Sequence, residues 1–399
     1  MKNNSHVDRG KNRQPSVLFL TPDSENPYGS SYSFLSILKH FKDRGARFGL
    51  YAVPPGYLHR QSRDWEVENG GYQFTWMTKQ TLSLRLVTLG WQKLMVLLAI
   101  FMMLLHGKYE VLYINTARHI SPLLAAWVLR RRTVVHVREG AEYFYGNARK
   151  KRIRNAILKR CVGTFICVSE SVADTVREAI PGANAVAVHN GLDLMELDAV
   201  VPTRATARTR LGIPGDLFVA ICVGRMHAEK AIVKFIAAGL EASKRIDNLK
   251  LVALGGPTDS TYFQEEVTPL AETGACGLVD LPGYCTNVFD YYAAADVFVH
   301  PATYDEPLAR TILEAMAMRC CVIATRVGGS PEIIRHSIDG ILVTPSSVAE
   351  IADAMVEVWE DPCKRAKMSN AARDTIETRF AVDRYVKEVE TQVALLRSS

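Results

Sequence analysis

The stretch "VVPTRATARTRLGIPGDLFVAICVG", residues 200–224, indicates where the chain begins a second domain. Residues 200–216 are rich in Pro, Thr and small residues and lack an apolar core, which is typical of a linker. Residues 217–224 then form a near-continuous apolar run of the length expected for a buried parallel strand. The stretch therefore predicts a linker followed by the first strand of a new sheet.

Strand-like apolar runs alternate with segments of helical spacing on both sides of this linker. The expected strands are residues 16–20, 47–53, 110–115, 133–137 and 164–169, closed by 185–193, and then 217–224, 249–256, 278–283, 295–301 and 320–325. Helical spacing covers residues 32–45, 232–243, 308–318, 348–359 and 380–396. This alternation predicts an α/β protein with two Rossmann-like, doubly wound domains that face each other across a cleft.

The sequence divides into four expected parts. Residues 1–15 are polar and patternless, which predicts a disordered tail, and they lack the apolar core of a signal peptide, which predicts a cytoplasmic location. Residues 16–200 and 201–379 are the two expected domains, because each has its own strand pattern. We expect the last segment, residues 380–399, to be a helix that packs back toward the first domain.

The net charge of +6 is unevenly distributed, with +11 on residues 1–200 and −5 on residues 201–399. The densest basic clusters are Arg130, Arg131 and Arg132, and "RKKRIRNAILKR" at residues 149–160. This asymmetry predicts that the first half faces something anionic. A solvated helix surface explains the 149–160 cluster equally well, because its charges fall on several faces of a helix.

The apolar run "LMVLLAIFMMLL", residues 94–105, is shorter than the roughly 20 residues of a membrane span. We expect a buried core helix, with an interfacial helix as the alternative. Together with the basic clusters, the run is compatible with peripheral association with an anionic membrane.

Several ligand classes lose support because their sequence signatures are missing. Neither G-x-G-x-x-G nor G-x-x-x-x-G-K-[ST] occurs, which argues against a dinucleotide-dependent oxidoreductase and a P-loop NTPase. The absence of D-x-D and H-E-x-x-H leaves no metal-binding signature. The 8 cysteines include no C-x-x-C pair, which predicts reduced thiols rather than a zinc site or disulfide framework.

The stretch "DEPLARTILEAMAM", residues 305–318, places two acids around the start of an expected helix. Pro307 suits the first turn, so the amides there are expected to be free for a phosphate. These amides belong to Leu308, Ala309 and Arg310. Glu314 can reach the same region, because helical side chains lean toward the N-terminus. With Glu306 before the helix, the two acids would accept hydroxyls on either side of a phosphate, which outlines a sugar–diphosphate–ribose compound.

Two basic residues, Arg225 and Lys230, follow an expected strand in "VGRMHAEK". Doubly wound sheets bind ligands at the carboxyl ends of their strands. Arg pairs with phosphate oxygens in bidentate fashion and Lys adds a compact point charge. The pair fits a phosphate, although two surface cations would produce the same sequence.

The segment "NPYGSSYSFL", residues 26–35, is a glycine-containing turn between the first expected strand and helix. Such a turn lets the backbone approach a ligand closely. Most glycines of this kind only form turns, so this segment by itself is a weak indication.

The chain resembles the retaining glycosyltransferases of family 4, which have the two-domain GT-B architecture. The resemblance covers nearly the whole chain and is strongest over residues 219–345. Its most specific element is Glu-x7-Glu within "EPLARTILEAMA". The segments "VSES", "VHNGLD", "VGR…EK" and "VGGSPEII" also follow the family's order and spacing.

The resemblance implies that the matching residues bind a nucleotide-diphosphate-sugar donor. It places Arg225 and Lys230 on the diphosphate. It places Glu314 on the nucleotide ribose and Glu306 on the donor sugar. Further donor-binding residues that it implies are Leu308, Ala309, Arg310, Gly29, Ser30, Gly283 and Tyr284. The catalytic candidates are Glu306, His136 and Arg138, and neither a metal nor another cofactor is implied.

The sequence departs from the family's pattern at several of these positions. The first-domain loop has "YGSS" where paired glycines are common, and Ala309 and Ala231 stand where glycine is usual. Each alanine slightly restricts the backbone. In "VVHVRE", His136 comes two positions before the family's histidine and Arg138 stands in its place, which leaves open which of the two faces the cleft.

The resemblance implies a retaining hexosyltransferase that moves a sugar from a nucleotide-diphosphate sugar to an acceptor hydroxyl. The first domain would bind the acceptor and the second the donor. We expect a glycan or lipid-linked acceptor in cell-surface polysaccharide or glycolipid biosynthesis, and no nucleic-acid partner. The alternatives are a nucleotide-sugar epimerase of the same architecture and a non-catalytic nucleotide-sugar-binding subunit.

Overall fold

The computed structural model describes residues 15–22, 29–52, 56–62, 65, 68–69, 82–107, 109–145, 149–256, 260–274 and 277–396. The chain forms two compact units. The first contains residues 1–168, 172–188 and 386–399, and the second contains residues 169–171 and 189–385. The expected tail lies outside the described residues except for Pro15.

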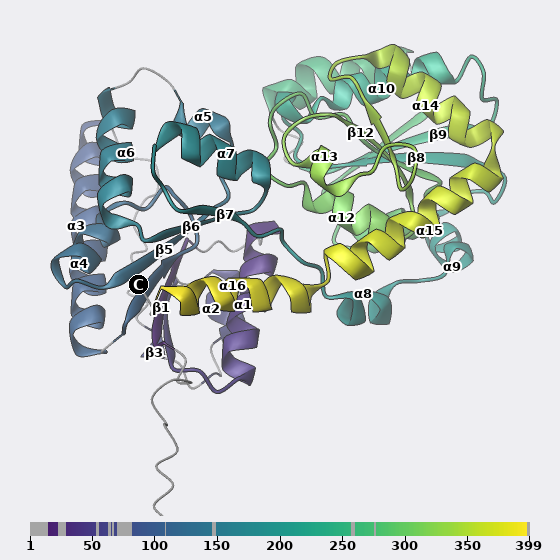
Figure 1. Ribbon diagram of the computed structural model, residues 1–399. Helices are drawn as coiled ribbons and strands as arrows, with labels where there is room; N and C mark the ends of the chain where they lie inside the picture. The colour runs from purple at the N-terminus through teal and green to yellow at the C-terminus, as the bar shows by residue number, and fades with distance from the viewer. Residues whose placement is uncertain are drawn as a thin grey trace, which may run out of the picture. The chain divides into compact units, whose positions relative to one another are not determined.

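The first unit is built on a seven-stranded parallel sheet (Figure 1). Its strands are β1 (Val17–Thr21), β2 (Phe48–Ala52), β3 (Glu68–Asn69), β4 (Val111–Ile114), β5 (Arg132–Val137), β6 (Thr164–Cys167) and β7 (Ala185–Ala187). They lie in the order β3-β2-β1-β4-β5-β6-β7, so the winding reverses between β1 and β4. This is the doubly wound topology that the alternating pattern predicts.

Helices cover both faces of this sheet. They are α1 (Gly29–Asp43), α2 (Tyr57–Ser62), α3 (Leu82–His106), α4 (Ser121–Val128), α5 (Ala141–Phe144), α6 (Arg149–Cys161) and α7 (Glu170–Ala179). In Figure 1, α3, α4 and α6 form one layer, and α1 lies on the opposite face of the sheet, as right-handed crossovers require.

The apolar run at residues 94–105 is the second half of α3, but the expectation of a buried core helix is wrong for most of it. Only Ile100 and Leu104 of this run are fully buried. Among the described residues, no helix has the length and apolar character needed to cross a membrane.

The second unit is built on a six-stranded parallel sheet in the order β10-β9-β8-β11-β12-β13. Its strands are β8 (Phe218–Val223), β9 (Leu249–Leu254), β10 (Val279–Gly283), β11 (Val297–His300), β12 (Cys321–Thr325) and β13 (Ile341–Val343). Its α-helices are α8 (Leu194–Val200), α9 (Arg204–Leu211), α10 (Ile232–Ala242), α11 (Val288–Ala294), α12 (Arg310–Ala317), α13 (Ser330–Ile333), α14 (Val348–Glu360) and α15 (Pro362–Arg379). Helix α16 (Val382–Leu395) begins in this unit and belongs to the first unit from Val386 onward. Shorter helical turns are η1 (Ala228–Lys230), η2 (Phe263–Val267) and η3 (Leu270–Gly274).

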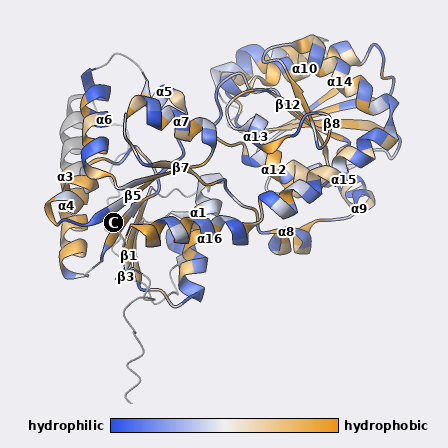
Figure 2. Ribbon diagram, in the orientation of Figure 1, coloured by the Kyte–Doolittle hydropathy of each residue, from blue (hydrophilic) through white to orange (hydrophobic). Residues whose placement is uncertain are grey.

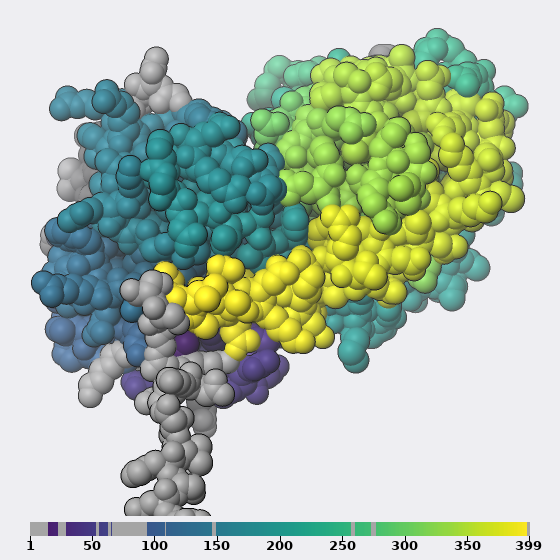
Figure 3. All heavy atoms as spheres, viewed as in Figure 1, coloured from purple at the N-terminus to yellow at the C-terminus, as the bar shows by residue number. Residues whose placement is uncertain are grey.

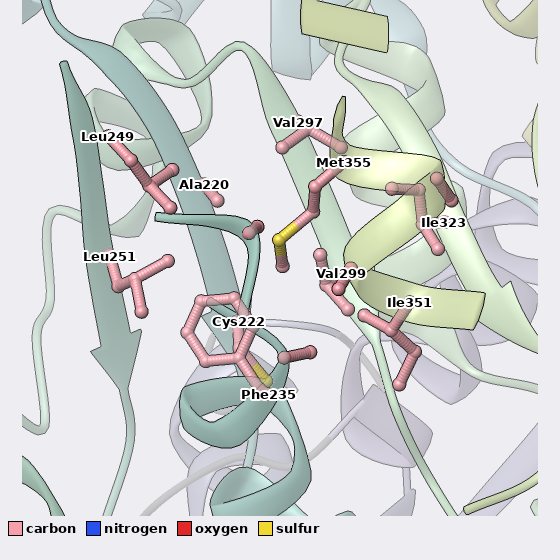
Figure 4. Packing of buried hydrophobic residues seen from close by; sticks show 14 of the residues in the cluster. Ala220, Cys222, Phe235, Leu249, Leu251, Val297, Val299, Ile323, Ile351 and Met355 are labelled. Atoms are coloured by element: carbon pink, nitrogen blue, oxygen red, sulfur yellow. The ribbon is translucent and has the colours of Figure 1, made fainter. Parts of the chain in front are cut away.

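The core of the second unit lies between this sheet and the helices α10 and α14. Figure 4 shows Met355 of α14 and Phe235 of α10 among aliphatic side chains of the central strands. Both residues are fully buried. Burying one large apolar side chain contributes about 1.5–3 kcal/mol of transfer free energy. This layer therefore stabilises the sheet that positions the site described below.

The expected linker, residues 200–216, contains helix α9, which corrects the sequence interpretation. Thr203 caps the helix, and its side chain accepts a hydrogen bond from the Thr206 amide. The guanidinium of Arg208 is buried and donates to carboxylate Oδ2 of Asp296 at 3.0 Å. A polar segment without an apolar stripe is therefore held by a buried ion pair, which hydrophobic periodicity does not detect.

The last helix, α16, is grouped with the first unit from Val386 onward. His40 Nε2 of α1 lies 2.8 Å from Glu390 Oε2 of α16. In Figure 3, the yellow end of the chain lies against purple residues of this unit.

Replacing Arg208 by alanine should lower the free energy of unfolding by roughly 3 kcal/mol, because the carboxylate of Asp296 loses a buried partner. Arg208 also donates to the carbonyls of Ala294, Pro214, Gly215 and Leu217. Chemical denaturation of the purified chain measures the change. Arg210→Ala, on the same helix but with an exposed side chain, is the control and should cost less than about 1 kcal/mol. Equal losses for the two variants would contradict the assignment.

Candidate active site

The candidate site of the second unit lies at the carboxyl ends of β8 and β11, where the winding of the sheet reverses. Lys230 ends the turn η1 after β8, and Glu306 lies in the loop after β11. Strands β8 and β11 are neighbours in the sheet. Two residues predicted from separate segments are therefore brought together.

Lys230 and Glu306 form an ion pair with little access to solvent. The Nζ atom of Lys230 lies 2.6 and 2.7 Å from the two carboxylate oxygens of Glu306. His300 Nε2 lies 2.8 Å from Oε2 of the same carboxylate. The side chains of Lys230 and Glu306 are 11% and 14% exposed. Removing one of these charges would leave the other unpaired, and little water could reach it to replace the lost partner.

These contacts keep Glu306 ionised. Burial by itself would raise the pKa of Glu306, but the neighbouring His300 and Lys230 outweigh it and lower the pKa to about 2. A carboxylate held in this way can only accept hydrogen bonds. Sugar hydroxyls, which can donate, are therefore suitable ligands for it.

Gly328 fixes the backbone of Glu306, a role that the sequence interpretation missed. Gly328 has φ +51°, and a Cβ atom there would lie 2.1 Å from the carbonyl oxygen of Glu306. The amide of Gly329 donates to that same oxygen at 2.9 Å. The sequence does not reveal this role, because the close approach arises only when the loops after β11 and β12 meet.

The helix after Glu306 begins later than expected. Helix α12 starts at Arg310, and Ala309 is its N-cap with extended backbone angles of φ −74° and ψ 104°. Leu308 precedes the helix, so the amides of its first turn begin at Arg310 rather than at Leu308. The backbone conformation of Ala309 is available to any residue, which explains why glycine is not required there.

Glu314 lies on the first turns of α12 and is paired with Arg310 of the same helix. The Nε atom of Arg310 donates to Oε1 of Glu314 at 2.8 Å. The hydroxyl of Tyr292 lies 3.5 Å from Oε2. A ribose at Glu314 would therefore share the carboxylate with these two neighbours.

Arg225 is the exposed cation of the site. It comes after Gly224, just past the end of β8, and it forms no ion pair or hydrogen bond through its side chain with the described part of the chain. Its guanidinium is thus available for an anion.

Ala231 occupies a left-handed backbone conformation between η1 and α10. Its angles are φ 51° and ψ 41°, and the residue is buried. This conformation suits glycine and costs an alanine about 1 kcal/mol. Ala231 directly follows Lys230, so the turn that positions the Lys230 side chain also contains the strained backbone.

Three glycines meet at the carboxyl ends of β8, β9 and β10. The amide of Gly255 donates to the carbonyl of Gly283 at 2.9 Å. A Cβ atom on Gly255 would lie 1.6 Å from the carbonyl oxygen of Gly224. Tyr284 follows Gly283 and is 70% exposed. The contact of Gly283 and Tyr284 with a nucleobase stays a prediction.

In the first unit, Gly29 and Ser30 are the first two residues of α1. They were expected in a turn, with the helix starting at residue 32. The hydroxyl of Ser33 donates to the Gly29 carbonyl at 3.1 Å. The preceding part of the expected turn, residues 26–28, lies outside the described residues.

The two catalytic candidates of the first unit are in different environments. His136 lies within β5, is fully buried, and its Nδ1 atom is 2.5 Å from the hydroxyl of Tyr113. Burial, followed by the charge of Arg138, lowers the pKa of His136 well below its usual value. Arg138 follows the carboxyl end of β5, and its Nε atom donates to Asn115 Oδ1 at 2.8 Å. Of the two, Arg138 is the residue at the carboxyl edge of the sheet, the edge at which doubly wound folds bind ligands.

Glu139 is a further residue at this edge that the sequence interpretation missed. It is buried, and its carboxylate accepts hydrogen bonds from the amides of Ala117 and Arg138 at 3.1 and 3.0 Å. The hydroxyl of Thr116 also donates to it. Glu139 thereby ties together the segments that follow β4 and β5.

The sequence matches two family models, one in each half. The model "Glycosyl transferases group 1" matches residues 203–375, and "Glycosyltransferase Family 4" matches residues 28–196. The two matches together cover most of the chain, which belongs to glycosyltransferase family 4. A D-inositol 3-phosphate glycosyltransferase of Thermobispora bispora is 31% identical over 50% of each chain. The lipopolysaccharide core biosynthesis glycosyltransferase LpsD of Rhizobium meliloti is 27% identical over 55% of this chain and 60% of its own. The chain thus spans about half the length of the curated relatives it matches.

Solved structures share the fold over nearly the whole chain. Anabaena HepE in complex with UDP-glucose has a TM-score of 0.77 at 20% identity, covering 95% of this chain and 99% of that one. WaaG, involved in lipopolysaccharide biosynthesis, has a TM-score of 0.69 at 15% identity, covering 95% and 99%. The chain therefore has the two-domain α/β fold called GT-B.

Replacing Ala231 by glycine should raise the free energy of unfolding by about 0.5–1 kcal/mol, because glycine adopts the left-handed conformation without strain. The matched control is Ala366→Gly on the exposed side of helix α15, which should lower the same quantity by about 1 kcal/mol. Denaturant titration compares the two. A loss of stability in Ala231→Gly would show that the alanine side chain is needed for packing.

The pKa of Glu306 predicts a pH-dependent stability difference between the native chain and Glu306→Gln. Since the pKa falls from 4.5 to about 2 on folding, the ionised carboxylate stabilises the fold fully above the unfolded value. The native chain should be more stable than the variant by roughly 3 kcal/mol near neutral pH. The difference should shrink as the pH falls through about 4.5 toward 2.

Denaturant titrations near neutral pH and in acid measure this difference. Exposed Glu360→Gln serves as the control and should leave stability unchanged at both pH values. A stability difference for Glu306→Gln that does not change with pH would contradict the pairing of Glu306 with Lys230.

Proposed function

We propose that the chain transfers a sugar from a nucleotide-diphosphate sugar to an acceptor hydroxyl, with retention of configuration at the anomeric carbon. The shielded Lys230–Glu306 pair carries this proposal, because it sets a cation and a carboxylate that is ionised at neutral pH just before the first turn of α12. Phosphate oxygens suit the cation and the helix amides. Sugar hydroxyls suit the carboxylate.

The donor would lie along the carboxyl ends of the second sheet. Arg225, Lys230 and the first turn of α12 would bind the diphosphate. Glu314 would accept the ribose hydroxyls and Glu306 those of the donor sugar. Tyr284 and Gly283 would face the base. That HepE structures contain UDP, or UDP-glucose, supports a donor of this class.

In the proposed reaction, the bond between the anomeric carbon and the donor phosphate oxygen breaks, and the acceptor oxygen bonds to the same face of that carbon. The departing phosphate oxygen keeps the bonding electron pair and takes the proton of the acceptor hydroxyl. The chain supplies position and charge rather than a nucleophile. Arg225, Lys230 and the helix amides would stabilise the leaving diphosphate, so the proposed reaction requires no metal.

The proposed acceptor is a glycan or a lipid-linked sugar in cell-surface polysaccharide or glycolipid biosynthesis. The names of LpsD and of the WaaG structure, which refer to lipopolysaccharide biosynthesis, support this class. We place the protein in the cytoplasm, working at the inner face of the membrane.

The test is a screen of nucleotide-diphosphate sugars for nucleotide release, with the mass of the acceptor product measured for each active donor. Lys230→Ala should lower the turnover by about 100-fold or more, because one donor to the leaving group is lost. Lys234→Ala, on neighbouring helix α10, is the matched control and should keep full activity. Glu314→Ala should raise the KM for the donor. Unchanged nucleotide release in both Lys230→Ala and Glu314→Ala would reject the site.

Further measurements separate the proposal from its alternatives. The proton coupling at the new anomeric centre, measured by NMR, reports retention. An altered sugar on an intact nucleotide would indicate an epimerase, and measurable donor binding without any turnover would indicate a binding subunit. Activity that disappears with a chelator and returns with a divalent metal would overturn the metal-free mechanism.

A further inference from the structure

An apolar stripe runs along the exposed side of α3 in the first unit. It consists of Leu94, Leu98, Met102 and Leu105, each between 41% and 50% exposed. Their spacing of four, four and three residues places them on one face of the helix. The described side chains of α3 from Leu94 to Leu105 include no charge. The stripe is therefore a continuous apolar surface.

Helix α4 packs beside α3 and extends this surface. Its residues Leu124, Trp127 and Val128 are 41%, 51% and 61% exposed. In Figure 2, much of α4 and of the described part of α3 is orange, which marks hydrophobic residues. We call Leu94, Leu98, Met102, Leu105, Leu124, Trp127 and Val128 the apolar face.

A basic hollow of about 830 Å³ adjoins the apolar face where α4 ends. Trp127 and Val128 line it together with Arg130, Arg131, Arg132 and Arg160, and its lining contains no acid. A smaller hollow beside it, of about 230 Å³, shares the first three arginines and includes Glu110. The carboxylate of Glu110 accepts a hydrogen bond from the Ser16 amide at 3.1 Å. The Nε atom of Arg131 is buried without a hydrogen-bond partner in the described chain.

Within the first unit, the basic hollow and the candidate site residues lie at opposite ends of the strands. Arg132 begins β5, and Val162 and Gly163 precede β6, so the hollow is at the amino ends of these strands. The first-unit candidates Arg138 and Gly29 follow the carboxyl ends of β5 and β1. This surface is therefore separate from the candidate site residues of the first unit.

We propose that the apolar face and the basic hollow dock the protein on a bilayer that contains anionic phospholipids. The aliphatic side chains and Trp127 would enter the headgroup boundary, and the four arginines would bind lipid phosphates. Docking rests on the proposed function in one respect: it would bring the chain to a lipid-linked acceptor. A second copy of the chain is a poorer occupant, since a symmetric contact would bring the two sets of arginines together.

Sedimentation of the full chain with vesicles tests the proposal. Vesicles of phosphatidylcholine with phosphatidylglycerol should bind the chain, vesicles of phosphatidylcholine alone should bind it far less, and added salt should weaken binding. The variant with Arg130→Gln and Arg160→Gln should bind about 25-fold more weakly, since each basic side chain contributes about fivefold. Lys367→Gln, an exposed cation of the second unit, is the matched control and should bind normally.

A second pair of variants tests the apolar face. Leu98→Ser combined with Met102→Ser should weaken binding to the mixed vesicles by about tenfold or more. Met195→Ser, at a side chain of the second unit that is 86% exposed, is the control. Circular dichroism checks that all variants fold.

Equal binding to both kinds of vesicle, or binding unchanged by the arginine and apolar variants, would overturn the proposal. So would a dimer, measured by light scattering, that the Leu98 and Met102 variants dissociate. Nucleotide release with water as the acceptor is an assay that needs no membrane, so it keeps the two proposals distinguishable. Normal release without vesicle binding rejects only the docking surface, and vesicle binding without release from any donor rejects only the proposed function.

Discussion

The shielded contact between Lys230 and Glu306 is the constraint on which the second unit's site depends. It joins the turn after β8 to the loop after β11, across the point where the sheet changes its winding. Gly328 then allows the loop after β12 to approach the Glu306 backbone. The side chain and the backbone carbonyl of Glu306 thereby hold together the loops after β8, β11 and β12. The strained turn at Ala231 persists because these contacts determine the position of Lys230.

Much of the fold could be predicted from the sequence because parallel strands buried on both faces are near-continuous apolar runs. The central strands, such as 217–224 and 133–137, were found within one or two residues. Helices α9 and α15 were not predicted, since their apolar residues do not form a stripe. Helix α9 is held instead by the buried guanidinium of Arg208, whose partner Asp296 is distant in the sequence.

The residues of the candidate site could be proposed from the sequence, but the contacts between them could not. Glu306, Glu314, Arg225 and Lys230 were identified from their types and their positions after strands. That Lys230 bonds to Glu306, and Arg310 to Glu314, depends on how the loops and helix turns fold. The role of Gly328 and the burial of His136 likewise arise only from packing. Periodicity also could not reveal that the apolar run in α3 is partly exposed, since a buried helix and an interfacial helix of this length have similar sequences.

The pairing of Lys230 with Glu306 has a consequence for selectivity. Without a ligand, the Lys230 ammonium is already paired with the Glu306 carboxylate. An inorganic anion that binds Lys230 must therefore break this ion pair and leave Glu306 unpaired, with little solvent around it. A ligand that brings phosphates and hydroxyls together can compensate both charges in one step. If the proposed donor binds here, the contact would therefore favour an intact sugar nucleotide over free pyrophosphate.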